Sequence, residues 1–91
     1  MSSDAILHLR MQVDSLNIMA NADDAAADWA KPLYDALMER FVSGTPRFTA
    51  MDYNRLRILK FYAQEKRQDA KRQRAEAESL QWAIDQIARP T

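Results

Sequence analysis

Polar side chains recur at intervals of three and four residues between Arg57 and Arg74, which would place them along one flank of a helix, and all of them except Gln64 are cationic. A row of guanidinium and ammonium groups can bind either a series of phosphates or a series of carboxylates. In a helix this row would be about 25 Å long, enough to follow several phosphates of a duplex. The sequence therefore predicts a partner-binding surface made of Arg57, Lys60, Arg67, Lys71, Arg72 and Arg74.

The chain also carries carboxylates that could pair with this cationic row internally. They follow one another at helical spacing in the first half of the sequence, at Asp24, Asp28, Asp35 and Glu39. The row therefore faces its own acidic helix, an acidic protein surface or nucleic acid. No aromatic side chain for base stacking lies between Gln64 and Ala77, and no zinc finger or glycine-rich RNA motif is present. We favour a protein partner and keep nucleic acid as the alternative.

Few residues of this sequence are suited to catalysis or metal binding. The chain has one histidine (His8), one glycine and no cysteine, which leaves no ligand set for structural zinc and no phosphate-binding loop. The Glu-x-x-His pairs of di-iron bundles are also missing from the sequence. We predict a non-enzymatic protein with no catalytic residue, no metal and no cofactor. A small hydrolase built around His8 is the weakest alternative.

The composition predicts an all-α fold. One glycine and three prolines are too few for the turns of a β architecture, and strong helix formers dominate the sequence. The 91 residues should form a single small domain, residues 1–91, with a thin core. Hydrophobic periodicity predicts helices at about 4–20, 22–42 and 49–88, arranged as a three-helix bundle or as a helical hairpin.

Local signals suggest where the first two of these helices divide. Asn21 is a good N-cap residue and two aspartates follow it closely, as at the start of a helix. Segments 4–20 and 22–42 can also be read as continuous through Asn21. Pro32 lies well inside the second segment, where we expect it to kink or restart the helix.

Stop and start signals between residues 42 and 53 define the turn before the last helix. Gly44 is placed to end the preceding helix in a left-handed conformation, and Pro46 should prevent its resumption. Thr49 should then cap the last helix, with Asp52 completing a capping box. The residues with the spacing of a hydrophobic staple are Phe48 and Tyr53.

The segment from Thr49 to Ala88 is the most unusual element of the sequence. About 40 helical residues would extend about 60 Å, whereas a compact domain of this size is only about 30 Å across. A heptad seam runs from Leu56 to Ile87, apolar at both ends and small or polar in its middle. The seam could be covered by the N-terminal helices running back as one arm, by a second copy, or by another protein. We favour a homodimer of antiparallel or crossed long helices. The predicted self-association residues are Ala70, Gln73, Ala77, Leu80, Trp82, Ile84 and Ile87.

Charge is unevenly distributed along the chain although the net charge is zero. Residues 1–46 carry three Lys/Arg and seven Asp/Glu, residues 47–74 carry nine and three, and residues 75–91 carry one and three. The first apolar run is interrupted by His8 and Arg10, and no stretch approaches the length of about 18 apolar residues that a membrane span needs. We expect a soluble, cytoplasmic protein that does not associate with membranes.

In size and helical style the chain resembles phage- or plasmid-encoded regulators, secretion chaperones and virion assembly factors, and this resemblance is one of general form only. Together with the long helix and the cationic row, it implies a protein-binding regulator, inhibitor, adaptor or assembly factor. The alternative is a nucleic-acid-binding regulator or packaging factor that uses the same cationic row.

Overall fold

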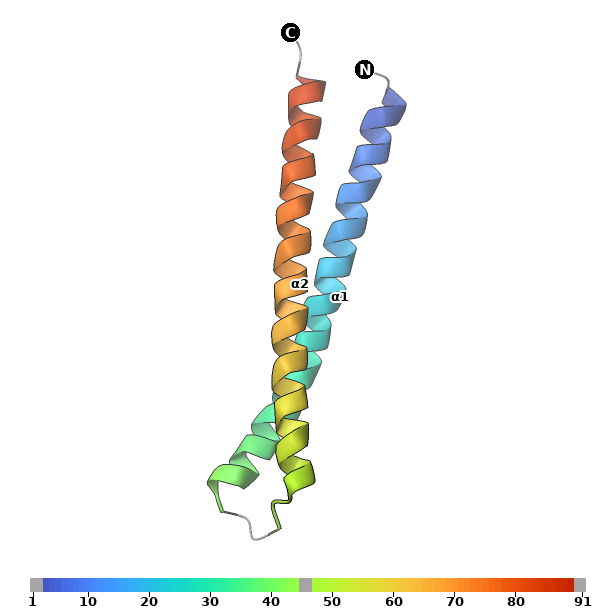
Figure 1. Cartoon of the computed structure of the whole chain (residues 1–91). Coiled ribbons are helices and arrows are strands. Elements are labelled where there is room, and N and C mark those ends of the chain that lie inside the picture. Colours follow the sequence, from blue (N-terminus) through green and yellow to red (C-terminus); the bar gives the residue numbers. More distant parts are fainter. Residues whose placement is uncertain (1–2, 45–46, 90–91) are drawn as a thin grey trace.

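The computed structural model describes residues 3–44 and 47–89. These residues form two α-helices and no strand: α1 (Ser3–Val42) and α2 (Ala50–Ala88), of 40 and 39 residues. The helices run antiparallel, so that the start of α1 and the end of α2 lie at the same end of a rod (Figure 1). The rod measures 70 × 17 × 15 Å. The all-α prediction is confirmed, and of the two predicted architectures the structure has the helical hairpin.

Helix α1 continues without a break through residues 21–24, where we predicted the cap of a second helix. That boundary is wrong, because Asp23 and Asp24 pair with side chains of α2 instead of capping a new helix. The heptad spacing of the side chains that face α2 also continues across this segment. These buried or half-buried positions are Ile6, Leu9, Val13, Leu16, Ala20, Asp23, Ala27, Ala30, Tyr34 and Leu37.

Pro32 lies inside α1 without interrupting it, so the helix does not restart there. Proline has no N–H to donate to the carbonyl four residues earlier, which weakens the helix at this point. In Figure 1 the ribbon of α1 changes direction in its green turns, which follow Pro32. A bend at this place agrees with the kink that proline usually causes.

The end of α1 has the predicted glycine stop. Gly44 adopts a positive φ of 69°, the left-handed conformation that glycine tolerates best. Its N–H donates to the carbonyl of Phe41 at 3.2 Å, which satisfies one of the free carbonyls at the helix end. Pro46, the other predicted stop residue, lies outside the described residues.

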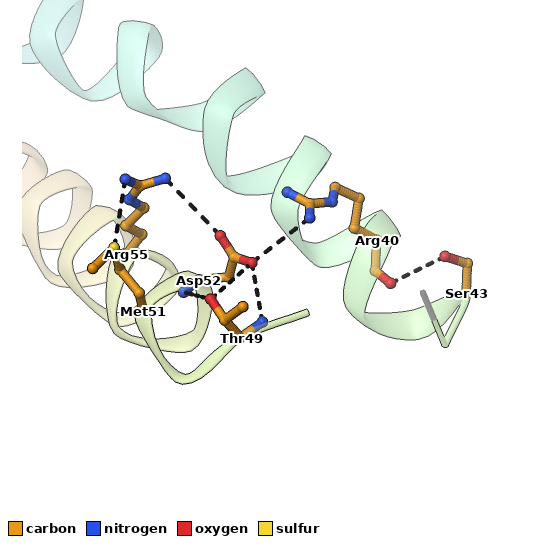
Figure 2. A network of polar contacts seen from close by, with 6 residues as sticks. All are labelled: Arg40, Ser43, Thr49, Met51, Asp52 and Arg55. Carbon is orange, nitrogen blue, oxygen red and sulfur yellow. Dashed lines mark hydrogen bonds and ion pairs between the residues drawn. The ribbon is translucent and has the colours of Figure 1, made fainter. Parts of the chain in front are cut away.

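The start of α2 confirms both predicted motifs. The hydroxyl of Thr49 accepts from the N–H of Asp52 at 3.2 Å, and the Asp52 carboxylate accepts from the N–H of Thr49 at 3.1 Å (Figure 2). The rings of Phe48 and Tyr53 meet edge-on with centroids 6.3 Å apart, as a hydrophobic staple requires. Phe41 of α1 completes a three-ring cluster, with centroids 5.4 Å from Phe48 and 5.5 Å from Tyr53. The turn is therefore closed by aromatic contacts from both helices.

The core is a narrow seam between α1 and α2 made largely of small side chains. Alanine allows two helices to pack closely, but it buries little apolar area for each residue. A cluster of larger side chains forms around Val13 and Ile84, near the end of the rod away from the turn. The buried hydrophobic residues are Val13, Ala20, Ala27, Ala30, Ala70, Ala77 and Ile84. The hairpin therefore has a thin core for a chain of this length.

Candidate interaction surfaces

Two of the predicted cations are held by polar side chains of α1. Arg67 donates from Nη1 to Oδ1 of Asp24 at 2.7 Å and from Nη2 to Asp28. Arg74 forms an ion pair with Asp24 and donates to Oδ1 of Asn21 at 3.0 Å. For Arg67 and Arg74 the structure therefore confirms the internal pairing of the cationic row with carboxylates of the first half.

These pairs shift the protonation equilibria of both partners. Hydrogen bonds from Arg67, and then from Arg74, hold the pKa of Asp24 below its ordinary value. The same contacts with Asp24 and Asp28 raise the pKa of Arg67. Because these side chains are partly exposed, each pair contributes little energy. Their main effect is to select the register in which α2 packs against α1.

The remaining cations of the predicted surface are differently placed. Arg72 pairs with Asp69 at 3.2 Å within α2. Arg57, Lys60 and Lys71 are exposed and form no ion pair with any residue in the described part of the chain. Of the six predicted positions, these three are exposed without an ion pair among the described residues.

The predicted self-association residues are mostly covered by α1 of the same chain. Ala70, Gln73, Ala77 and Ile84 are buried, and Leu80 and Ile87 are half-buried. The heptad seam of α2 is therefore covered in the first of the three ways that we considered, by an N-terminal arm running back along α2. Trp82 is the exception, because 66% of it is exposed.

A polar network at the turn joins the ends of the two helices. Arg40 of α1 and Arg55 of α2 approach the Asp52 carboxylate from opposite sides, with N–O distances of 3.6 and 4.0 Å (Figure 2). Asp52 is only 8% exposed. Hydrogen bonds from the backbone N–H and the hydroxyl of Thr49, together with the charges of the two arginines, hold the pKa of Asp52 below its ordinary value. Sequence reasoning found the capping box but not Arg40, which lies 12 residues before Asp52 in the chain.

One side of α2 near the turn combines free cations with exposed aromatic rings. Tyr53 and Phe61 are 53% and 57% exposed, and helical spacing places them beside Arg57 and Lys60. Tyr53 and Arg57 also line a groove that reaches Phe41 and Phe48 at the turn. We call the set Tyr53, Arg57, Lys60 and Phe61 the cationic patch.

A second surface lies on α1, outside the seam that faces α2, although its Trp29 ring meets Tyr62 of α2 edge-on with centroids 6.4 Å apart. Helical periodicity places the residues of this surface within one 120° sector, which we call the outer face of α1. The sector contains no charged residue between Asp4 and Arg40. Its large side chains, Met11, Ile18, Met19, Trp29 and Leu33, are 44–67% exposed. The small residues of the outer face are Ser15, Ala22, Ala25, Ala26 and Ala36.

A second heptad-like pattern in the first half of the sequence marks this outer face. Met11, Ile18, Ala25 and Pro32 recur every seven residues, out of phase with the seam that faces α2. Because α1 is continuous, this pattern runs along one helix and is not divided near Asn21.

Folding also separates charge along the rod. The third nearest the turn, residues 30–62, carries six Lys/Arg and three Asp/Glu. The opposite third, residues 1–17 and 75–91, carries two and five, while the middle is neutral. The hairpin therefore has a positive pole at the turn and a negative pole at the other end.

The described residues contain no candidate metal site. No group of three or more His, Cys, Asp or Glu side chains lies close enough together to hold a metal there. His8 is exposed and shares a hydrogen bond of 3.2 Å with Gln12, one turn along α1. Neither α1 nor α2 contains a stretch long and apolar enough to cross a membrane.

Comparison with known proteins gives no relative from which a function could be transferred. No family model, no curated protein and no solved structure matches this chain.

Proposed function

We propose that this chain is a non-enzymatic protein-binding module that acts as a regulator, inhibitor, adaptor or assembly factor. The observation that carries the proposal is the cationic patch, where Arg57 and Lys60 form no ion pair with any described residue and lie beside Tyr53 and Phe61. Arginine and aromatic side chains are the residues most enriched in protein interfaces.

The chemistry of the cationic patch favours a partner that presents carboxylates beside apolar side chains. Exposed aromatic rings gain free energy when they are covered, and the free cations would select an acidic surface. The positive pole at the turn would also speed the approach of such a partner. Binding through an accessible helix needs no rearrangement of the hairpin.

Nucleic acid is the second candidate, because the same free cations could contact phosphates. The carboxylates on the flank beside these cations argue against binding to nucleic acid. Asp24 and Asp28 lie along this flank with Arg67 and Arg74, so that the middle of the rod is neutral and would not attract a continuous phosphate backbone.

The test compares the wild-type chain with two charge-reversal variants as bait in an extract of the native host, with and without nuclease. Arg57→Glu/Lys60→Glu alters the cationic patch. Arg10→Glu/Arg89→Glu makes the same change in charge at the opposite pole and serves as the matched control. We expect the wild type and the control to retain the same protein, and the patch variant to lose it, whether or not nuclease is present.

Two results would contradict this proposal. Retention by the patch variant of every protein that the wild type retains would remove the patch as the binding surface. Loss of binding on nuclease treatment, with wild-type binding to a duplex that weakens steeply with salt, would establish the nucleic-acid function instead.

A further inference from the structure

The hairpin exposes far more surface than a compact protein of its mass. Its accessible surface is 6990 Å², whereas a compact monomer of 10.5 kDa would expose about 5,400 Å². The excess is about 1,600 Å², and a standard stable interface covers about 800 Å² on each partner. One such interface would remove about half of the excess.

The outer face of α1 is the surface best suited to such an interface. It has no charge over most of the length of α1, and its exposed side chains include Met11, Ile18, Trp29 and Leu33. The small residues Ala22, Ala25 and Ala26 occupy its centre, where they would let a second helix approach closely. Exposed apolar surfaces of this length are characteristic of interaction sites.

The charges at the two ends of the rod identify the occupant. Residues 1–17 and 75–91 carry two Lys/Arg and five Asp/Glu, whereas residues 30–62 carry six and three. A second copy running antiparallel, with Ala22 at the middle of α1, sets the negative pole of each hairpin against the positive pole of the other. A parallel pair would superpose like charges at both ends, which is unfavourable.

We propose that the outer face of α1 is covered by a second copy of this chain, in an antiparallel dimer whose two-fold axis passes near Ala22. The two α1 helices form the centre of the dimer, and the two α2 helices lie outside. This arrangement differs from the dimer expected from the sequence, in which the α2 seam would pair, because that seam already packs against α1. It leaves the cationic patch of both copies accessible.

The first test is the mass of the protein by sedimentation equilibrium, which does not depend on the shape of a rod. We expect the wild type to have twice the chain mass of 10.5 kDa at micromolar concentration. Ala25→Glu places a carboxylate in the interface and should raise the dimer dissociation constant at least about tenfold, because a buried unpaired charge is strongly unfavourable. Ala75→Glu makes the same change at an exposed position of α2 and should remain a dimer.

The second test determines the orientation and uses the absence of cysteine from the chain. Ala22→Cys, near the proposed axis, should form a disulfide-linked dimer. Met11→Cys and Leu33→Cys should cross-link to each other when mixed, and much less to themselves. Preferential self-linking of Met11→Cys would show a parallel pair and overturn the proposal.

Other outcomes would also overturn it. A wild type that stays monomeric at high concentration would exclude a second copy as the occupant of the outer face. A dimer disrupted by Trp82→Glu but not by Ala25→Glu would place the interface on α2. The outer face and the cationic patch share no residue, so a failure here is distinguishable from a failure of the proposed partner binding.

Discussion

Gln73 should destabilise the hairpin, and replacing it with an apolar residue of similar shape should make the protein more stable. Gln73 is 8% exposed and lies on the alanine-rich part of the seam between Ala70 and Ala77. Its Oε1 is buried and has no hydrogen-bond partner among the described residues. A carbonyl oxygen that gives up water without gaining a partner costs about 1–3 kcal/mol.

Methionine is the best replacement because its unbranched side chain follows the path of glutamine without a polar terminus. Gln73→Met removes the unsatisfied oxygen and leaves the helix propensity nearly unchanged. We therefore expect the free energy of unfolding to rise by about 1–2 kcal/mol. For a domain of this size, each kcal/mol corresponds to a rise in Tm of about 4–8 °C.

Thermal unfolding followed by circular dichroism, at one fixed protein concentration, measures this change. The matched control is Gln68→Met, which makes the same substitution at an exposed position of α2 and should change stability by less than about 0.5 kcal/mol. If Gln73→Met is no more stable than the wild type, then Oε1 already has a satisfactory partner, such as a bound water, and the reasoning is refuted.

Two further predictions concern the turn and the ion pairs. Thr49→Ala removes the hydroxyl that caps α2 and should lower stability by about 1 kcal/mol, while Thr49→Ser should retain most of the wild-type value; equal urea midpoints for the two variants would contradict the capping role. The folded state lowers the pKa of Asp24 and of Asp52, so the folded chain binds these protons less readily than the unfolded chain does. Their contribution to stability is therefore complete above the ordinary carboxyl pKa of about 3.9 and is lost as the pH falls through the lower folded-state values. We expect Tm to be nearly constant from about pH 7 to pH 5 and to fall below about pH 4, less steeply in Asp24→Asn; an Asp24→Asn profile that parallels the wild type would show that this carboxylate has no part in the loss.

Features determined by neighbouring residues were predicted closely. The capping box of Thr49 with Asp52, the staple and the left-handed Gly44 each depend on groups within about one helical turn, so their residue types identify them. The heptad seam of α2 was also predicted, because its spacing repeats over many turns.

Features determined by contacts between distant residues were predicted less well. Asp23 and Asp24 have the residue types of a helix start, and only the presence of Lys66 and Arg67 more than 40 residues later directs them to α2. Arg40 was likewise not associated with Asp52. The sequence left open whether the cationic row pairs internally, because no local pattern distinguishes Arg57, which forms no ion pair with the described residues, from Arg67, which does.

The sequence alone determined that the chain is helical, where the turn lies, and which side chains of the last helix form a seam. These properties follow from backbone propensity, capping and periodicity, which act over a few residues. The tertiary structure decided what covers that seam, which cations keep their charge free, and that α1 is one helix with an uncharged outer face. Those outcomes depend on the register of two helices against each other, and that register is selected by pairs such as Arg67 with Asp24, 43 residues apart in the chain.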